Sequence, residues 1–397
     1  MTDSPLIFRK GLDRKQEVAH LLAENYHSEL VADIKANDFQ WASGRLQIHL
    51  AREFGFCYGV DRAVDYAYQA RARFPDREVY LTGEIIHNPH VNDRLREQGV
   101  HFLSDPGMAV DALTPDAVVI LPAFGVPTDL LQQLVSLGCT LVDTTCGSVL
   151  NVWKNVRRYA TDGLTSVIHG KAWHEETQAT ASQALHAGGH YLVVLDAEQA
   201  AIVCAYVRGG GDRQAFLETF APAVSPGFDP DRHLAHIGCA NQTTMLSSES
   251  LAIGEMFRAA VRDRYQDADL PTRFRAFDTI CSATQDRQDA VEVLLAGQRL
   301  DLMIVLGGYN SSNTYNLARI CAEAVPTYHI AEPAALISAQ EISHRPVHAK
   351  DVAIHAGWLP EGPVTIGLTS GASTPDNLVG AVVRRLDELT NSTGCKE

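Results

Sequence analysis

Apolar and polar positions alternate along most of the chain in a way that predicts strands followed by helices. Short runs rich in β-branched residues are each followed by a stretch whose apolar residues recur every three or four positions. This order is typical of βα units in parallel sheets, so an α/β fold is expected. The strand-like runs cover residues 77–83, 116–124, 165–170, 190–196, 234–240, 301–308 and 364–371.

The first 44 residues depart from this pattern. They are mostly polar and carry one helical stripe in which apolar residues recur every fourth position, namely Val18, Leu22, Tyr26, Leu30 and Ile34. We interpret residues 1–44 as an N-terminal arm that packs on the body of the protein or on a partner subunit.

A cysteine lies at the junction between a strand-like run and a helix-like run at three places. Cys146 and Cys281 follow the related stretches DTT and DTI, and Cys57 lies in the looser stretch GFCYGV. A polar loop follows in each block after 30, 28 and 30 residues, at His87, His174 and Ser311. Near-constant spacing of this kind predicts a threefold internal repeat.

The repeat divides the chain into an arm, three α/β domains and a tail. The expected boundaries are 1–44, 45–140, 141–275, 276–389 and 390–397. In parallel α/β layers the loops at the carboxyl ends of the strands form the ligand site. Three such domains around a pseudo-threefold axis would direct the three cysteines at one point.

The net charge and the apolar runs exclude two classes of partner. A formal charge of -15 argues against nucleic-acid binding, which needs clustered Lys and Arg. The longest nearly apolar run, 117–127, is too short to cross a bilayer, and the N-terminus lacks the apolar core of a signal peptide. We expect a cytoplasmic protein without a nucleic-acid or membrane partner, and we allow for a homodimer.

The three junction cysteines favour a metal centre. Cysteines at helix N-termini are biased toward the thiolate, which prefers zinc or iron–sulfur clusters. Separations of 89 and 135 residues exclude zinc fingers and ferredoxin-type runs. An iron–sulfur cube held by three cysteines would leave one iron open to substrate, which implies catalysis. Cys239 is a weaker candidate for a fourth ligand.

The loops near these cysteines are rich in neutral hydrogen-bond donors and contain almost no Lys or Arg. Hydroxyls, imidazoles, an amide and helix N-termini could hold a phosphate in a dry pocket. A buried glutamate beside them could donate protons, and the spacing does not decide between Glu175 and Glu176. The other candidates are His87, His174, Thr243, Ser311, Ser312, Asn313 and Ser373.

Eight motifs identify a family. In chain order they are GFCYGVDRAV, EIIHNPHVNDRLREQGV, DTTC, HEET, NQTTM, DTICSATQDRQ, NSSNTYNL and SGASTPD. In this order, from about residue 46 to 386, the chain resembles the 4-hydroxy-3-methylbut-2-enyl diphosphate reductases, in the branch found in photosynthetic lineages. That family catalyses the last step of the methylerythritol phosphate route to isoprenoids.

The resemblance implies a trefoil of three α/β domains around one [4Fe–4S] cluster with three cysteine ligands, Cys57, Cys146 and Cys281, and one open iron. It implies a reductive dehydroxylation that yields isopentenyl and dimethylallyl diphosphate. Glu176 would relay protons, with His174 and Thr243 beside it. The substrate contacts implied are His87, His174, Thr243, Thr284, Ser311, Ser312, Asn313 and Ser373.

One position departs from the family pattern. Many relatives have a histidine that contacts the diphosphate where this chain has Phe124.

No nicotinamide or flavin fingerprint is evident, so we expect an external electron donor, a ferredoxin first and a flavodoxin second. Because such donors and this chain are both acidic, docking would need a local basic surface, for which 156–158 and 94–96 are candidates.

Two alternative functions stay open on the sequence. Quinolinate synthase also joins three α/β domains around a three-cysteine cluster, although the NSSN and HEET loops fit the diphosphate reductase better. A non-catalytic iron–sulfur sensor would instead hold a closed cluster that is indifferent to added diphosphate.

Overall fold

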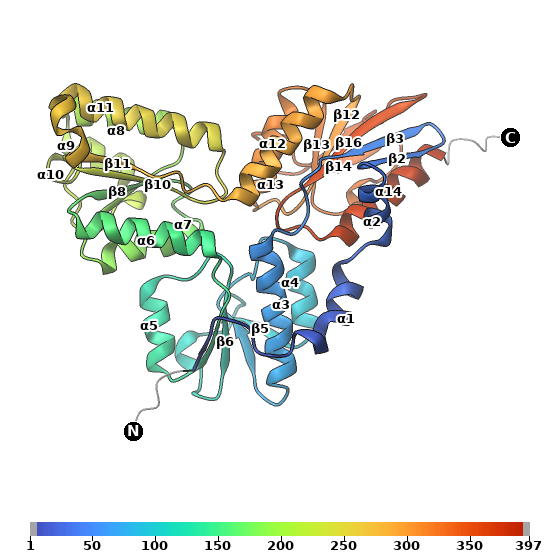
Figure 1. Ribbon diagram of the computed structural model, residues 1–397, viewed down its shortest axis with the longest axis horizontal. Coiled ribbons are helices and arrows are strands. Elements are labelled where there is room, and N and C mark those ends of the chain that lie inside the picture. The colour runs from blue at the N-terminus through green and yellow to red at the C-terminus, as the bar shows by residue number, and fades with distance from the viewer. Residues whose placement is uncertain (1–5, 392–397) are drawn as a thin grey trace. The chain divides into compact units, whose positions relative to one another are not determined.

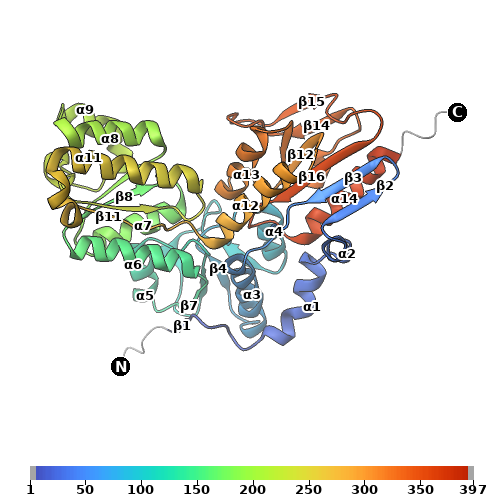
Figure 2. The ribbon, with the colours of Figure 1, turned by 45° about the horizontal axis from the view of Figure 1, so that its top comes forward.

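The structure is a computed structural model and describes residues 6–391. These residues form two compact units, each built from several stretches of chain, and each unit is described by itself. Unit 1 comprises residues 6–10, 76–83 and 101–281, and unit 2 comprises residues 11–75, 84–100 and 282–391. Figures 1 and 2 show sheets flanked by helices. The α/β class predicted from the alternating pattern is confirmed.

The first sheet of unit 1 has the strand order β1-β7-β6-β4-β5. β1 pairs with β7, β7 with β6 and β6 with β4, all in parallel. The central strand β6 is buried along its whole length, as expected for a parallel strand covered on both faces. The strands are β1 (Ile7–Phe8), β4 (Val79–Leu81), β5 (Val100–Phe102), β6 (Val118–Leu121) and β7 (Thr140–Asp143), with η1 (Val110–Ala112) and α5 (Thr128–Ser136) between them.

The second sheet of unit 1 is parallel, with the order β11-β10-β8-β9. Its strands are β8 (Thr165–His169), β9 (Tyr191–Val194), β10 (Ile237–Asn241) and β11 (Phe274–Ala276). α6 and α7 cover one face, whereas α8 and α11 cover the other (Figures 1 and 2). The helices are α6 (Gly147–Thr161), α7 (Glu175–His186), α8 (Ala197–Gly209), α9 (Arg213–Phe220), η2 (Ala221–Ala223), α10 (Pro230–His233) and α11 (Ser247–Arg273).

The main sheet of unit 2 has the order β13-β12-β16-β3-β2, in which only the edge strand β2 is antiparallel. Its strands are β2 (Gln40–Ser43), β3 (Leu46–Leu50), β12 (Leu302–Leu306), β13 (Thr327–Ile330) and β16 (Val364–Ser370), and β14 (Glu341–His344) pairs separately with β15 (Ala353–Ala356). The helices are α1 (Lys15–Tyr26), α2 (Glu29–Ala36), α3 (Tyr58–Arg73), α4 (Pro89–Glu97), α12 (Ser282–Gly297), α13 (Ser312–Ala322), η3 (Pro333–Ala335) and α14 (Asp376–Asn391).

Strand β12 shows how this sheet separates two cores. Because successive side chains of a strand point to opposite faces, Ile304 lies in one hydrophobic cluster and Val305 lies in another. The first cluster includes α2 and α14, and the second includes α12 and α13. A strand buried on both faces reads as a continuous apolar run, which is how 301–308 was recognised in the sequence.

The junction cysteines mark the points where the chain leaves one sheet for the next. β7, before Cys146, pairs in the first sheet, and α6, after it, packs its apolar face with Leu164, directly before β8, and with Ala240 of β10 in the second sheet. Likewise β11, before Cys281, pairs with β10, and α12, after it, packs in unit 2. The strand before Cys57 is β3, which pairs with β16 from the C-terminal part of the chain.

The arm contains two helices where the sequence stripe suggested one. α1 ends at Tyr26, and the Ser28 side chain caps α2 by accepting a hydrogen bond from the Val31 amide. The predicted tail at 390–397 lies largely outside the described residues, and the five predicted domain boundaries remain predictions. No helix in the described part of the chain is both long and apolar enough to cross a membrane.

Acidification is expected to destabilise the protein through His329 in β13. This side chain is 2% exposed, and its Nε2 donates to the Gly307 carbonyl at 3.0 Å. Burial lowers the pKa of His329 from 6.5 to about 4, so the unfolded chain binds the proton more readily than the folded protein does. The contribution is complete above pH 6.5 and is lost as the pH falls toward about 4, by roughly 3 kcal/mol.

The measurement is the melting temperature at about pH 7.5 and about pH 5 for the unmodified protein and for His329→Gln. The glutamine amide can still donate to the Gly307 carbonyl but does not titrate, so the variant should lose less stability on acidification. An equal loss in both proteins would contradict the assignment.

Candidate active site

The structure sorts the predicted site residues into two groups, one in each unit, and every one of them is buried or half-buried. Unit 1 holds Cys146, His174, Glu176, Thr243 and Cys281. Unit 2 holds Cys57, His87, Thr284, Ser311, Ser312, Asn313 and Ser373. Residues from distant parts of the sequence are therefore brought together within each unit.

All three predicted cluster ligands lie directly before a helix. Cys57 and Cys146 are the N-cap residues of α3 and α6, and Cys281 immediately precedes α12. None of the three is in a disulfide, and each is half-buried. Each of the three therefore lies at the positive end of a helix dipole.

The other cysteines of residues 6–391 lie in the hydrophobic core. Burial raises the pKa of Cys139, of Cys204 to about 11 and of Cys321 to about 12. Cys239, the weaker candidate for a fourth ligand, is buried in β10, and burial raises its pKa too. A raised pKa disfavours the thiolate, so this environment argues against Cys239 as a ligand.

The buried carboxylate of Glu176 is joined through Thr243 to Cys281. Glu176 Oε1 accepts from the Thr243 amide at 2.6 Å, and Oε2 accepts from the Thr243 hydroxyl at 3.0 Å. The Thr243 carbonyl in turn accepts from the Cys281 amide at 3.1 Å. Within unit 1, the Glu176 carboxylate, which is 3% exposed, is thus connected through a single residue, Thr243, to the predicted metal ligand Cys281.

His174 is oriented by two neighbours. It is the N-cap residue of α7, and its Nδ1 accepts from the Glu176 amide at 3.1 Å. In the neutral ring the proton then lies on Nε2, which makes this edge a hydrogen-bond donor. The Phe124 ring meets the His174 ring nearly perpendicularly, with centroids 5.9 Å apart. Phe124 therefore packs against the side of the His174 ring.

Gln242 supports the loop before His174, and the sequence reasoning did not single it out. Its Oε1 accepts from the Lys171 amide at 3.1 Å and from the Thr177 hydroxyl at 3.2 Å. A Cβ on Gly170 would lie 2.9 Å from the Gln242 Cβ, so the close approach requires glycine there. The signal in the sequence was the motif NQTT, residues 241–244, from which only Thr243 was selected as a site candidate.

In unit 2 four loops are tied together by backbone contacts. The Asn313 Oδ1 accepts from the Ala372 amide at 2.9 Å, and the Ala372 carbonyl accepts from the Cys57 amide at 3.1 Å. Ser373 Oγ donates to the His87 carbonyl at 3.2 Å. Predicted substrate contacts from two repeats, the first and the third, and one predicted cluster ligand therefore belong to one hydrogen-bonded assembly.

Two further polar residues, Glu84 and Asn310, hold His87 and were not predicted. The His87 Nδ1 lies 2.8 Å from the Glu84 Oε2, and the Asn310 amide nitrogen donates to the same oxygen at 2.9 Å. The Glu84 carboxylate therefore fixes the orientation of the His87 ring. The Glu three residues before His87 was the signal in the sequence.

The start of α13 is built as an anion site. Ser311 is its N-cap, Ser312 and Asn313 follow in the first turn, and all three are buried. The Asn313 Nδ2 is buried and has no hydrogen-bond partner among residues 6–391. A buried amide donor without a partner costs free energy unless a ligand accepts its hydrogen bond.

Buried positive charge lies under the Cys57 loop. Arg287 of α12 is 3% exposed and donates from Nη2 to the Gly55 carbonyl at 2.8 Å. Thr284, one turn earlier, is fully buried in the same helix. The sequence reasoning selected Thr284 and overlooked Arg287, although both lie in the motif DTICSATQDRQ.

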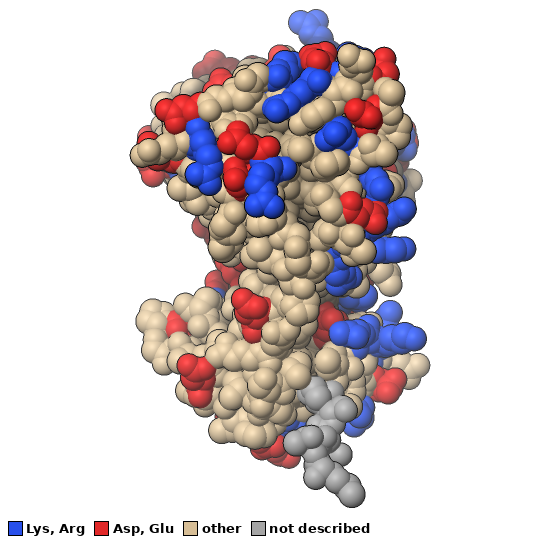
Figure 3. All heavy atoms as spheres, turned by 90° about the vertical axis from the view of Figure 1, so that its left-hand side faces the viewer, with Lys and Arg blue, Asp and Glu red and all other residues tan. Residues whose placement is uncertain are grey.

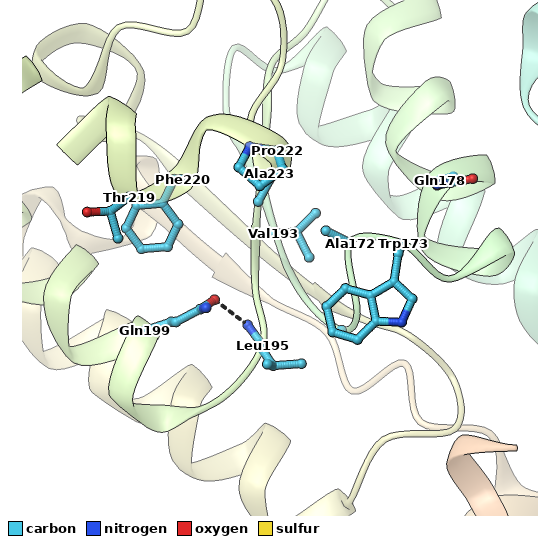
Figure 4. Close-up of a pocket in the computed structure, with 11 residues that line it drawn as sticks. Ala172, Trp173, Gln178, Val193, Leu195, Gln199, Thr219, Phe220, Pro222 and Ala223 are labelled. Atoms are coloured by element: carbon cyan, nitrogen blue, oxygen red, sulfur yellow. Dashed lines mark hydrogen bonds between the residues drawn. The ribbon is translucent and has the colours of Figure 1, made fainter. Parts of the chain in front are cut away.

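A cavity of about 330 Å³ in unit 1 lies behind the loop that carries His174. Figure 4 shows Trp173 at one side of it and Phe220 at the other, with Val193 and Leu195 between them. No acidic or basic side chain is among its described lining residues, so it is unsuited to a diphosphate. The chemistry of the candidate site lies instead in the loops described above.

The chain matches the family described as LytB protein over residues 48–387. It is 47% identical over 387 residues to the 4-hydroxy-3-methylbut-2-enyl diphosphate reductase of Synechococcus sp. (strain CC9311), which covers 97% of this chain and 96% of that protein. The enzymes of the same name from Thermosynechococcus vestitus and Gloeobacter violaceus are also 47% identical, over 384 and 389 residues.

Two solved structures resemble the fold. One is described as (E)-4-hydroxy-3-methyl-but-2-enyl diphosphate reductase, the terminal enzyme of the non-mevalonate pathway. It has a TM-score of 0.53 and 26% identity and covers 86% of this chain and 99% of that one. The other, a diphosphate reductase from Plasmodium falciparum, has a TM-score of 0.60 at 22% identity and covers 85% of this chain and 86% of that one, and it bears on the fold alone.

Proposed function

The chain belongs to the LytB protein family, and from this premise we propose that it reduces 4-hydroxy-3-methylbut-2-enyl diphosphate to isopentenyl and dimethylallyl diphosphate. The reaction breaks the allylic C–O bond, takes up two electrons and two protons, and releases water. It is an oxidoreductase reaction and the last step of the methylerythritol phosphate pathway.

An iron–sulfur cluster fits the donor set. Cys57, Cys146 and Cys281 are half-buried at helix starts, in contrast to the core cysteines, whose pKa values are raised by burial. We assign these three as ligands of one [4Fe–4S] cluster with one iron open to substrate. When bound, the cluster would supply electrons one at a time and a Lewis-acidic iron for the alcohol oxygen.

The unit 2 loops would hold the diphosphate. Ser311, Ser312 and Asn313 present two hydroxyls and an amide at the N-terminus of α13, where the helix dipole also favours negative charge. His87, backed by the Glu84 carboxylate, and the hydroxyl of Thr284 extend this set of contacts. Ser373 would join them by giving up its hydrogen bond to the His87 carbonyl. Each hydrogen bond to a charged group contributes roughly 1.5 to 3 kcal/mol, so several together would fix the substrate.

Glu176 would deliver protons through Thr243. The Oε2 to Oγ1 hydrogen bond can reverse its direction when the carboxylate is protonated, because the Thr243 hydroxyl both donates and accepts. The hydroxyl can then pass a proton outward toward the departing oxygen. His174, with its proton on Nε2, would orient the same part of the substrate. A buried relay of this kind keeps bulk water away from the reacting carbon.

One observation carries this assignment: the buried carboxylate of Glu176 is linked through Thr243 to the backbone of Cys281. The test is anaerobic purification followed by iron and sulfide analysis and by assay of both products with a reduced viologen as electron donor. A folded, iron-loaded protein that releases neither product from the diphosphate would contradict the proposal.

Neither alternative function is favoured by the family match. A quinolinate synthase would turn over its own substrates in the same assay, and a sensor would show a cluster spectrum that added diphosphate does not change. The assay therefore separates all three functions.

Asn313→Asp is expected to weaken substrate binding strongly without loosening the loop. The aspartate can still accept from the Ala372 amide, as Asn313 Oδ1 does at 2.9 Å, so the folding contact is retained. It replaces the unpartnered amide donor with a negative charge facing the anion, and we expect KM to rise about a hundredfold.

The measurement is KM and kcat with a reduced viologen, together with the melting temperature. The matched control is Asn151→Asp, which makes the same change at an exposed position of α6, outside the proposed diphosphate site. An unchanged KM for Asn313→Asp would remove Asn313 from the diphosphate site.

A further inference from the structure

We propose that the exposed face of α6 and the adjoining end of β11 form the docking surface for a small acidic protein that carries one electron. This inference rests on the proposed function, because a chain that reduces its substrate must receive electrons from outside. We call the surface the α6 patch, and its residues are Leu150, Lys154, Arg157, Arg158, Arg275 and Phe277.

The charged residues of the α6 patch form a ridge. Lys154, Arg157 and Arg158 are spaced three and four residues apart, so they share one side of the helix, and all three are exposed. Arg158 and Arg275 both lie against the Asp162 carboxylate, which neutralises only one of them. Lys154 has no ion-pair partner among the described residues.

The local charge is opposite to that of the whole chain. α6 contains no acidic residue, and the carboxylates nearest to the patch along the chain are Asp162 and Asp278, against four cations. The full chain carries a formal charge of -15. Figure 3 shows several Lys and Arg side chains along the right-hand edge of that view. A basic area on an acidic protein directs an acidic partner to one place.

The other basic stretch suggested by the sequence, 94–96, lacks this property. Arg94 pairs with Glu97 at 2.7 Å, and Arg96 pairs with Asp93 at 3.4 Å, both within α4. These four charges cancel on one helix surface. The structure therefore favours 157–158 over 94–96 as the centre of a docking surface.

Apolar side chains accompany the cations. Leu150 is 42% exposed, one turn before Lys154, and Phe277 is 41% exposed and stacks on Tyr159 of α6 with ring centroids 6.2 Å apart. Exposed apolar groups inside a charged rim are the usual composition of a protein–protein contact.

The patch lies close along the chain to two predicted cluster ligands. α6 begins directly after Cys146, and Lys154 is eight residues further, about 12 Å along the helix. Phe277 lies four residues before Cys281. Each visit of the reduced partner would oxidise it by one electron, and two visits would supply the two electrons that, with two protons, break one C–O bond and release one water.

The experiment compares two charge reversals in the iron-loaded protein. Lys154→Glu with Arg158→Glu reverses the ridge, and Arg258→Glu with Arg262→Glu makes the same change at the same spacing on α11 as a control. The probe is an acidic [2Fe–2S] ferredoxin. We expect its Kd at low salt to rise at least tenfold for the α6 variant only, with a weaker dependence on salt.

Turnover separates this inference from the proposed function. With a reduced viologen as donor, the α6 variant should match the unmodified protein, whereas the KM for ferredoxin should rise at least tenfold. Equal ferredoxin binding by the α6 and α11 variants would overturn the docking surface. Absent viologen-driven turnover in the unmodified protein would instead overturn the function, and the binding comparison would still decide the surface. The neutral pair Lys154→Gln with Arg158→Gln provides an intermediate case if the reversal unfolds the protein.

Discussion

Glu176→Gln is expected to lower kcat by at least about a hundredfold while the diphosphate still binds. The glutamine keeps the side-chain volume and can still accept from the Thr243 amide, a contact of 2.6 Å in the unmodified protein. Its NH2 group would face the Thr243 hydroxyl and can only donate to it, whereas the carboxylate accepts there at 3.0 Å. The amide cannot take up and release a proton, so the relay stops.

The measurement is single turnover of substrate by the pre-reduced protein, with binding followed separately through the cluster spectrum. Glu175→Gln is the matched control, because Glu175 is the adjacent residue but is exposed, whereas Glu176 is 3% exposed. The control should retain turnover within about threefold. Comparable losses in both variants, or none in Glu176→Gln, would remove the assigned role.

Cys281→Ser is expected to abolish turnover, because the cluster should be lost. The change keeps the Cys281 backbone contact to the Thr243 carbonyl and replaces only the sulfur atom. A serine hydroxyl is a harder ligand than a thiolate and deprotonates much less readily, so it binds iron poorly at neutral pH. Iron and sulfide content per folded chain should fall to a small fraction of the unmodified level.

Cys321→Ala is the control for this experiment. Cys321 is also a free cysteine, but it is fully buried in α13, where burial raises its pKa to about 12. The control should lose some stability through the lost packing and should keep its iron. Unchanged iron and sulfide in Cys281→Ser would contradict the ligand assignment.

Local pattern was sufficient to find most elements that position the site. All seven strand-like runs overlap a strand, as at 118–121 and 302–306, because buried parallel strands are continuously apolar and β-branched. The polar loops of the site were found because they follow those strands. Short or edge strands such as β2 and β5 were missed, since few residues carry their pattern.

Residues that act through another residue were also missed. Glu84, Gln242 and Arg287 are defined by long-range or turn contacts, such as those to His87, Lys171 and Gly55 respectively. Nothing in the local hydrophobic pattern marks such a contact, because hydrogen-bond partners are selected by the fold.

The sequence by itself determined the α/β class, the family, the three cysteines at helix starts and the polar residues of the loops, because each depends on local periodicity or on a short motif. Only the tertiary structure decided that β3 pairs with β16 from the other end of the chain, that Glu176 and not Glu175 is buried against Thr243, and that Asn313 keeps an unpartnered donor. These outcomes depend on which strands exchange backbone hydrogen bonds and which side chains lose contact with water, and both are properties of the packed chain.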